Sequence, residues 1–287
     1  MRSLIGSGRG SGRTGLLQTP EGMAIAQVSR DRTHAMPRLL TLNYLETAAE
    51  ETDRLSRSLD KLDLRKLPCN RVLAGDDYQL LLVEAPDVEP SELRAAVRWR
   101  IRDLIDFHID DAVIDVFDIP GQDQARARMM YVVACRAPVV QRVVDAMEAG
   151  PLALEVIDIA ELALRNVAAL LEEDVEGVAL LHLERDYGLI TVTRQASLYL
   201  ARRIDSGYAE LHAAMAEDAV AEDAFPGPAT RELIGSMVLE LQRSLDYYES
   251  HLSAAPATSV CINLPPETPA QLISEFESSL SVPVRAL

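Results

Sequence analysis

Gly177–Leu183 (GVALLHL), Tyr187–Thr193 (YGLITVT) and Ser197–Ala201 (SLYLA) form the stretch of sequence that decides the fold. The first segment is a continuous apolar run of strand length, which is typical of a strand buried on both faces. The other two alternate apolar and polar residues, as strands with one buried face do. Short connections between the segments predict hairpins. The sequence therefore predicts three consecutive strands.

The residues that follow predict a helix, a strand, a second helix and a last strand. An apolar stripe at helical spacing indicates a long helix that begins near Thr230, its expected N-cap. A strand is predicted at Ser259–Leu264, a helix at Pro269–Leu280 and a short strand at Val282–Val284. The order βββαβα is that of the ribonuclease-H-like fold, which the actin-type ATPases share.

The N-terminal half begins with a similar order. Strands are predicted at Thr14–Thr19, Gly22–Val28 and Arg38–Tyr44, followed by a helix over about 45–62 and a strand at Tyr78–Glu84. The repetition predicts an α/β fold with mixed sheets, built from two duplicated halves. The expected organisation is a flexible tail at 1–13, a first half at 14–176 with a module inserted at about 88–136, and a second half at 177–287.

Composition excludes several classes of protein. The net charge of −17 argues against sequence-independent binding of nucleic acid, which needs a basic surface. No run of 18 apolar residues occurs, so we expect no transmembrane span, and no apolar segment near the N-terminus predicts a signal peptide. The five histidines and three cysteines show no spacing typical of a metal site. We therefore expect a protein without a bound metal.

Two longer segments carry a resemblance to a known family. They are Ala95–Ile119 (AAVRWRIRDLIDFHIDDAVIDVFDI) and Tyr131–Leu170 (YVVACRAPVVQRVVDAMEAGPLALEVIDIAELALRNVAAL). Together with Ser197–Asp205 and Glu240–Leu252, they resemble the PilM-like family of type IV pilus assembly proteins. Within that family the similarity is to MshI of the mannose-sensitive haemagglutinin (MSHA) pilus. The resemblance implies an actin-like fold whose inserted module has the order strand-helix-strand-strand.

The resemblance also implies a place and a partner. Members of the family are cytoplasmic, lie at the inner membrane, and hold the N-terminal cytoplasmic peptide of a bitopic PilN-like or MshJ-like protein. The peptide groove lies beside the inserted module, which makes Arg98, Trp99, Arg102 and Phe107 candidate partner-binding residues. Trp99 has two interpretations: a half-buried residue that holds its helix in place, or one wall of the groove, since Trp and Arg are frequent at interface hot spots.

The sequence departs from the family pattern at the turns that hold nucleotide. An acidic residue and a lysine expected in the first two strands are replaced near Leu17 and Ala24, and the Asp-x-Gly of the second half reads His182-Leu183-Glu184. A glycine pair near the adenosine reads Pro265-Pro266, and only Gly207 remains of the pair after the third strand. Leu17 cannot hold Mg²⁺, Glu184 would repel phosphate, and proline has no N–H to donate.

These departures predict a non-enzymatic scaffold of MSHA or type IV pilus biogenesis that needs no cofactor. The alternative is a nucleotide-binding actin-like ATPase, or a switch, of pilus or type II secretion assembly. That alternative would use atypical loops to bind ATP and Mg²⁺.

Overall fold

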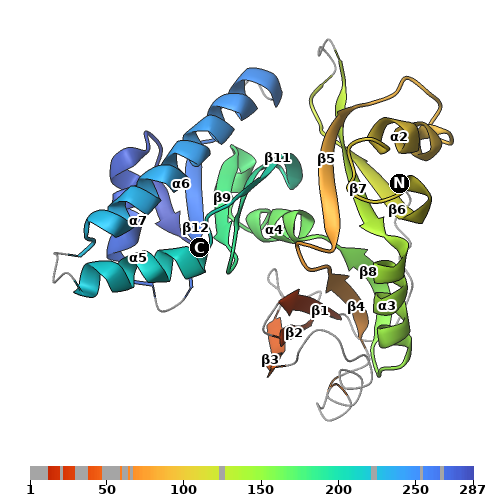
Figure 1. Ribbon diagram of the computed structural model, residues 1–287, viewed down its shortest axis with the longest axis horizontal. Helices are drawn as coiled ribbons and strands as arrows, with labels where there is room; N and C mark the ends of the chain where they lie inside the picture. The colour runs from red at the N-terminus through yellow and green to blue at the C-terminus, as the bar shows by residue number, and fades with distance from the viewer. Residues whose placement is uncertain are drawn as a thin grey trace. The chain divides into compact units, whose positions relative to one another are not determined.

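The structure of the protein is a computed structural model, which describes residues 12–19, 22–29, 38–46, 59, 64, 67–122, 127–220, 225–252, 255–265 and 268–287. The described residues divide into two compact units (Figure 1). The first unit takes in the residues up to Phe117 together with Met129–Ala160. The second takes in Asp118–Arg128 together with Glu161–Leu287.

The first unit contains a five-stranded sheet with the strand order β3-β2-β1-β4-β8. Its strands are β1 (Gly12–Thr19), β2 (Gly22–Ser29), β3 (Arg38–Glu46), β4 (Pro68–Val72) and β8 (Ala153–Asp158). The first three strands pair antiparallel, and β4 lies parallel between β1 and β8. One face of the sheet packs through Leu16, Met23 and Ile25 against Met147 of α3 (Ala137–Glu148). Burial of these apolar side chains stabilises this half of the chain.

The predicted fourth strand of the first half is wrong. Tyr78–Glu84 does form a strand, β5, but its partner is β7 in a separate three-stranded sheet. Pro68–Val72, which has no alternating apolar pattern, takes the fourth place because it pairs with β1 and β8. Two boundaries also differ: Gly12 and Arg13 already belong to β1, and β3 continues to Glu46.

The rest of the predicted tail and of the helix over 45–62 lies outside the described residues. Leu59 is described; it is helical and fully buried in the core of the five-stranded sheet.

The inserted module, which includes β5 in addition to the expected segment at about 88–136, has the order strand-helix-strand-strand that the resemblance implies. It comprises β5 (Tyr78–Glu84), α2 (Leu93–Ile101), the short 3-10 turn η1 (Ile109–Asp111), β6 (Ala112–Asp118) and β7 (Met129–Arg136). The sheet order is β5-β7-β6, and α2 covers one face of the sheet (Figure 1). Val97 and Ile101 of α2 are fully buried against Val83, Met130 and Val132. Apolar residues four apart on the helix create this contact.

The second unit holds the other five-stranded sheet, in the order β11-β10-β9-β12-β13. Its strands are β9 (Val178–Leu183), β10 (Gly188–Arg194), β11 (Ser197–Ile204), β12 (Ser259–Asn263) and β13 (Val284–Ala286). The helical segments of the unit are α4 (Ala160–Ala168), η2 (Glu172–Val175), α5 (Tyr208–Val220), α6 (Pro228–Tyr247), η3 (Tyr248–Leu252) and α7 (Gln271–Ser279). Figure 1 shows α5, α6 and α7 on one side of the sheet and α4 on the other.

The two five-stranded sheets have the same strand order and the same strand directions. Each begins with three antiparallel strands, and each then adds two parallel strands beside the first. This confirms the predicted duplication and the mixed α/β class. The three strands predicted from residue 177 onward form as β9, β10 and β11. None of the described helices combines the length and the apolar composition that a bilayer crossing needs.

Two details of the second unit differ from expectation. The predicted alternation of buried and exposed residues is not found in strand β10, because Gly188–Thr193 are all buried and both faces of the strand are covered. Thr230 is not an N-cap, because α6 begins two residues earlier and Thr230 is fully buried within its first turn. The carboxylate of Asp218, at the end of α5, binds the helix start instead: it accepts hydrogen bonds from the backbone N–H groups of Ala229 and Thr230, each at 3.0 Å.

Candidate functional site

The turn between β9 and β10, where an actin-type ATPase binds phosphate, is closed against the start of α5. The backbone N–H of Tyr208 donates to the carbonyl of Glu184 at 2.8 Å, and that of Ala209 donates to the carbonyl of Arg185 at 2.9 Å. A Cβ added at Gly207 would lie 2.2 Å from the same Arg185 carbonyl oxygen, so only glycine permits this approach. Donors at a helix start that could bind an anion are thus already occupied by protein carbonyls.

Three polar side chains fill the ends of β9 and β12 in the same region. His182 Nε2 lies 3.1 Å from Glu184 Oε1, and His182 Nδ1 lies 2.8 Å from Asn263 Nδ2. The side chains of His182 and Glu184 are about one-fifth exposed. His182 is therefore partly buried, and both of its ring nitrogens have a polar partner. No group of acidic, Cys and His side chains within the described part of the chain could hold a metal ion. Pro265 follows β12, and its carbonyl accepts from Thr268 N–H at 3.0 Å.

In the first unit, the corresponding ends of β1 and β2 are held together by their own side chains. Leu17 and Ala24 are directly opposite each other on β1 and β2, so the structure brings these two sequence-predicted positions together. Gln18 Nε2 donates to the carbonyls of Thr19 and Gly22 at 3.1 and 3.0 Å. The Thr19 hydroxyl accepts from Gly22 N–H at 3.2 Å. The described residues on either side of this turn are thus linked by their own hydrogen bonds.

Sequence reasoning missed a buried arginine at the end of β4. Arg71 is 9% exposed, and its only described side-chain contact is from NH2 to Gln18 Oε1 at 3.5 Å. Burial lowers the pKa of this guanidinium, although the nearby Cys69 and Asp77 partly offset that effect. Burial also raises the pKa of Asp77, which the charges of Arg142 and Arg71 partly counteract. Nothing in the sequence indicated this buried arginine, because Pro68–Val72 has no alternating apolar pattern that would predict a strand.

The four predicted partner-binding residues do not form one surface. Trp99 is 74% exposed, which makes the interpretation as a half-buried residue wrong, and the Arg102 guanidinium lies 5.8 Å from its ring centroid. Arg98 instead turns toward η1, where it donates to the carbonyls of Ile109 at 2.5 Å and Ala112 at 3.1 Å.

Phe107 packs partly buried against the core of the inserted module. The Arg136 guanidinium lies 4.7 Å from its ring centroid. Trp99 and Arg102 are therefore the two predicted residues that lie together and open to solvent.

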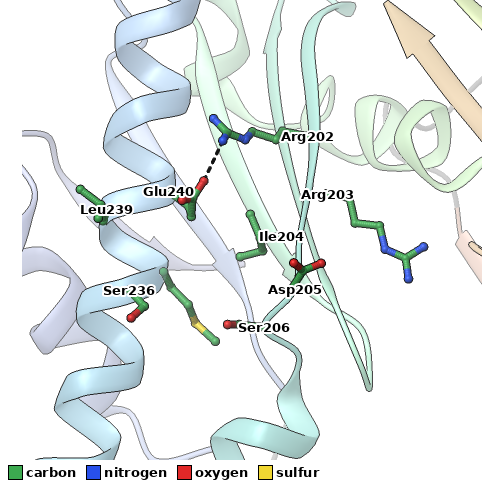
Figure 2. Close-up of a pocket in the computed structure, with 9 residues that line it drawn as sticks. Arg202, Arg203, Ile204, Asp205, Ser206, Ser236, Leu239 and Glu240 are labelled. Carbon is green, nitrogen blue, oxygen red and sulfur yellow. Dashed lines mark ion pairs between the residues drawn. The ribbon is translucent and has the colours of Figure 1, made fainter. Parts of the chain in front are cut away.

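A cavity of about 460 Å³ lies between the end of β11 and α6 (Figure 2). Arg202 NH2 lies 2.9 Å from Glu240 Oε2 across it, and Arg243 of α6 contacts the other carboxylate oxygen at 2.7 Å. The Arg203 side chain points elsewhere and lies over the Tyr187 ring at 3.8 Å. Glu240 is thus shared by two arginines, so the described guanidinium group of Arg202 beside this cavity already has a carboxylate partner.

No protein-family model matches the chain, and no curated protein matches it. Solved structures do match it. The chain is similar to a structure described as the PilM-PilN type IV pilus biogenesis complex, with a TM-score of 0.73 and 20% sequence identity. The match covers 96% of this chain and 88% of that chain.

Two further matches have the same fold at lower similarity. One is a Bacteroides thetaiotaomicron protein of unknown function with an actin-like ATPase fold (TM-score 0.56, 7% identity, 96% and 91% coverage). The other is the cytoplasmic domain of EpsL, an inner-membrane component of the type II secretion system of Vibrio cholerae (TM-score 0.53, 12% identity, 94% of each chain). The chain therefore has the actin-like fold, in the form that occurs in a PilM-PilN complex.

Proposed function

We propose that this protein is a non-enzymatic scaffold of type IV pilus biogenesis at the cytoplasmic face of the inner membrane. It binds the N-terminal cytoplasmic peptide of a bitopic PilN-like protein, and in the MSHA system, to which its MshI-like segments point, of an MshJ-like protein. The observation that carries the proposal is the similarity of nearly the whole chain to a PilM-PilN complex.

The closed turns support a role without nucleotide. The N–H groups of Tyr208 and Ala209 are engaged by the β9–β10 turn, and the carboxylate of Glu184 adds negative charge there. A triphosphate would have to displace these contacts and would meet the negative charge of Glu184. The chain is thus proposed to keep the ATPase fold as a frame for protein contacts.

The exposed pair Trp99 and Arg102 supports a contact surface on the inserted module. The Trp99 side chain is 74% exposed, and a partner that covers it would remove unfavourable contact between its apolar ring and water. The nearby Arg102 guanidinium can donate hydrogen bonds to carbonyls or carboxylates of that partner. Arg98 and Phe107, which serve the module internally, are assigned a supporting role.

A second candidate function is favoured by the similarity to the EpsL cytoplasmic domain. In that case the partner would be a component of a type II secretion system. The nucleotide-dependent switch remains the alternative of a different class, and its distinguishing property is binding of ATP with Mg²⁺.

Isothermal titration calorimetry with Mg-ATP and Mg-ADP tests the scaffold against the switch. We expect no binding heat at millimolar nucleotide, because the helix-start donors are occupied. Micromolar binding of either nucleotide would refute the scaffold and establish the switch.

Co-purification with full-length candidate membrane proteins tests the partner. Deleting about the first dozen residues of a PilN-like or MshJ-like protein should abolish co-purification, since an extended peptide supplies the contact. Trp99→Ala should weaken it, whereas Val220→Ala, at an apolar residue of the second unit that is also exposed (86%), should not. Undiminished co-purification after the deletion would contradict the proposal, and co-purification with EpsL-associated secretion proteins instead would favour the second candidate.

A further inference from the structure

Arg71, near the end of β4, carries a buried positive charge that the described residues leave almost without a partner. It is 9% exposed, and its Nε and NH1 atoms form no hydrogen bond with the described residues. NH2 lies 3.5 Å from Gln18 Oε1, at the outer limit of hydrogen-bond length. No carboxylate among the described residues lies within ion-pair distance of this guanidinium. A buried charge without a partner is strongly destabilising, so the unsatisfied donors point to a binding partner.

The Arg71 side chain lies on the face of the first sheet that packs against α3. Arg71 pairs in register with Leu16 of β1, and Cys69 shares its face because it lies two residues earlier on β4. Leu16 and Cys69 belong to the same core cluster as Met147 of α3. Leu17, where the family resemblance places an Mg²⁺ ligand, is the next residue along β1 and therefore points to the opposite face. The Arg71 side chain is thus separate from the position at which an actin-type ATPase binds nucleotide.

The groups closest to the guanidinium do not neutralise its charge. Gln18 Nε2 donates to the carbonyls of Thr19 and Gly22 at 3.1 and 3.0 Å, which holds its Oε1 toward Arg71. That oxygen is a neutral acceptor. Burial raises the pKa of the Cys69 thiol to about 11, so this group is uncharged at neutral pH.

Asp77, in the loop after β4, acts on Arg71 only at a distance. Its charge partly offsets the effect of burial on the pKa of the guanidinium. Burial also raises the pKa of the Asp77 carboxyl, and the charge of Asp76 acts in the same direction. Arg142 of α3 acts on the same carboxylate in the opposite direction. The influence of Asp77 is thus divided between two arginines, and it forms an ion pair with neither.

The duplicated half shows that the fold does not need a charge at this place. Strand β12 is the counterpart of β4, because it lies parallel between β9 and β13 as β4 lies between β1 and β8. Its sequence, Ser259–Asn263 (SVCIN), contains no charged residue, and its first four residues are buried. An apolar side chain would therefore serve the packing of β4, and the charge of Arg71 calls for another explanation.

We propose that Arg71 binds a small inorganic oxyanion, of the size of phosphate or sulfate, at the carboxyl end of β4. A guanidinium presents its N–H donors in fixed directions that match pairs of oxygen atoms on such an anion. The carboxyl ends of parallel strands are the usual position for ligands in open α/β sheets. Because Nε and NH1 have almost no exposed surface, the anion is enclosed when it binds, and larger phosphate esters do not fit.

Calorimetric titration of the full chain with inorganic phosphate, in a buffer whose anion is gluconate, tests the site. We expect saturable binding to the wild type and binding about tenfold weaker, or weaker still, to Arg71→Met, which keeps an apolar side chain and removes the charge. Arg94→Met is the matched control. Arg94 also belongs to the first unit, but it is about 70% exposed and pairs with Asp115 at 2.9 Å, so this variant should bind phosphate like the wild type.

Thermal unfolding separates lost binding from lost folding. In gluconate buffer, Arg71→Met should be at least as stable as the wild type, because it removes an uncompensated buried charge. Phosphate should raise the melting temperature of the wild type and of Arg94→Met by more than that of Arg71→Met, since only the first two gain from binding. The general effect of the salt is common to all three proteins and cancels in the comparison.

Two further variants change the site without removing the arginine. Gln18→Glu would place a carboxylate beside NH2 of Arg71, where it can pair with the guanidinium, so phosphate binding should be lost. Asp77→Asn should tighten phosphate binding a few-fold, because it removes a negative charge that acts on Arg71. Circular dichroism checks that each variant is folded.

Equal phosphate affinity of the wild type and Arg71→Met would overturn the proposal, and so would a wild type that binds neither phosphate nor sulfate. If Arg71→Met does not fold, Gln18→Glu decides, because phosphate binding that persists there would also overturn the proposal. Glycerol phosphate is the size control: affinity equal to that of inorganic phosphate would refute an enclosed free anion. The co-purification and nucleotide experiments test other residues, so this proposal and the scaffold proposal can fail separately.

Discussion

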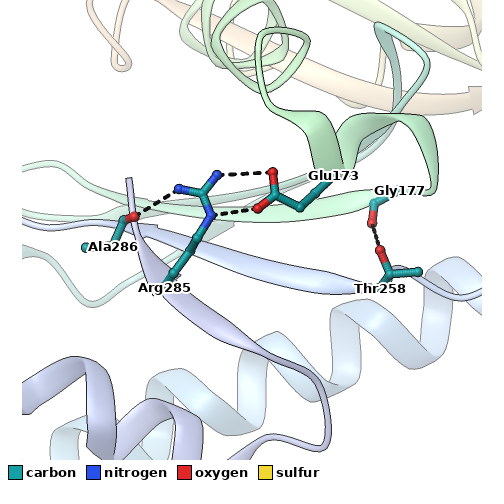
Figure 3. A network of polar contacts seen from close by, with 5 residues as sticks. All are labelled: Glu173, Gly177, Thr258, Arg285 and Ala286. Atoms are coloured by element: carbon teal, nitrogen blue, oxygen red, sulfur yellow. Dashed lines mark hydrogen bonds and ion pairs between the residues drawn. The ribbon is translucent and has the colours of Figure 1, made fainter.

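Arg285 and Glu173 form a two-pronged ion pair that joins the last strand to the segment leading into β9 (Figure 3). Arg285 Nε lies 2.7 Å from Glu173 Oε1, and NH2 lies 3.1 Å from Oε2. Nearby, Thr258 donates to the carbonyl of Gly177 through both its backbone N–H (2.9 Å) and its hydroxyl (3.1 Å). These contacts fix the start of β9 against β12 and β13.

Glu173→Gln should lower the free energy of unfolding by about 0.5–1 kcal/mol, a small value because water screens both partly exposed side chains. Urea unfolding at neutral pH would measure the loss. Arg94→Ala is the control: Arg94 contacts Asp115 at 2.9 Å, but both side chains are about 70% exposed, so no measurable change is expected.

The same pair predicts a pH dependence. The side-chain hydrogen bond from Arg285 lowers the pKa of Glu173, so the folded state binds a proton at lower pH than the unfolded state. Its stabilisation is therefore complete above the unfolded pKa of about 4.3 and is lost as the pH falls through the lower folded value. The difference between wild type and Glu173→Gln should shrink below about pH 4. A difference that stays constant down to pH 3 would contradict this.

Asp218→Ala should lower the melting temperature because it leaves two N–H groups of α6 without acceptors. Gly227→Ala should produce a similar loss, since its Cβ would lie 2.4 Å from the Asp218 carboxylate carbon. Combining the two changes should add little to either alone, because both remove the same contact. Thermal unfolding followed by circular dichroism measures all three, and fully additive losses would refute the shared mechanism.

Asp218 should also contribute to acid sensitivity. Burial by itself would raise the pKa of this carboxyl, but hydrogen bonds from Thr230 and Ala229 outweigh it and lower the pKa. The contribution is present above the unfolded pKa of about 3.9 and disappears as the pH falls through the lower folded value. Melting temperatures of wild type and Asp218→Ala should converge in that range.

Arg98→Ala should affect mainly stability, and Arg102→Ala should affect mainly binding of the partner peptide. Arg98 donates to two carbonyls at η1, so its loss should destabilise the protein by about 1–2 kcal/mol. Arg102 contacts only Asp103 and the Trp99 ring among described residues, so Arg102→Ala should leave stability nearly unchanged and weaken peptide capture. Urea unfolding and peptide binding, measured on the same preparations, would separate the two roles.

Restoring the acidic-x-glycine pattern of the second half should not restore nucleotide binding. In a His182→Asp, Glu184→Gly variant the backbone carbonyls at 184 and 185 would still occupy the N–H groups of Tyr208 and Ala209. Calorimetry with Mg-ATP should remain silent. Micromolar affinity in this variant would mean that the two side chains alone exclude nucleotide from the wild type.

Much of the second half could be predicted because its signals are local. The apolar run that forms β9 and the stripe on α6 each depend on residues within one element. The first half was harder. Pro68–Val72 contains Asn70 and Arg71 and has no strand pattern, yet it is a central strand because β1 and β8 pair with it on either side. Tyr78–Glu84 has a strong strand pattern but joins another sheet.

The candidate site also has some properties that the sequence predicts and others that only the structure shows. The sequence by itself predicts that Leu17 cannot coordinate Mg²⁺, that Glu184 repels phosphate and that Pro265 offers no N–H donor, because each follows from the chemistry of one side chain. It could not distinguish Arg98 from Arg102, which differ only in what lies within reach of each side chain.

The sequence by itself determined the order of strands and helices in the second half, the repeated halves and the residue types at the turns where actin-type ATPases bind nucleotide. These depend on the periodicity of neighbouring residues and on side-chain chemistry. Only the tertiary structure decided which strand completes the first sheet, that Asp218 binds the start of α6, and that β3 is the last described strand on its side of the first sheet. Each of these depends on contacts between residues distant in the chain, and the periodicity of one segment carries no information about its partner.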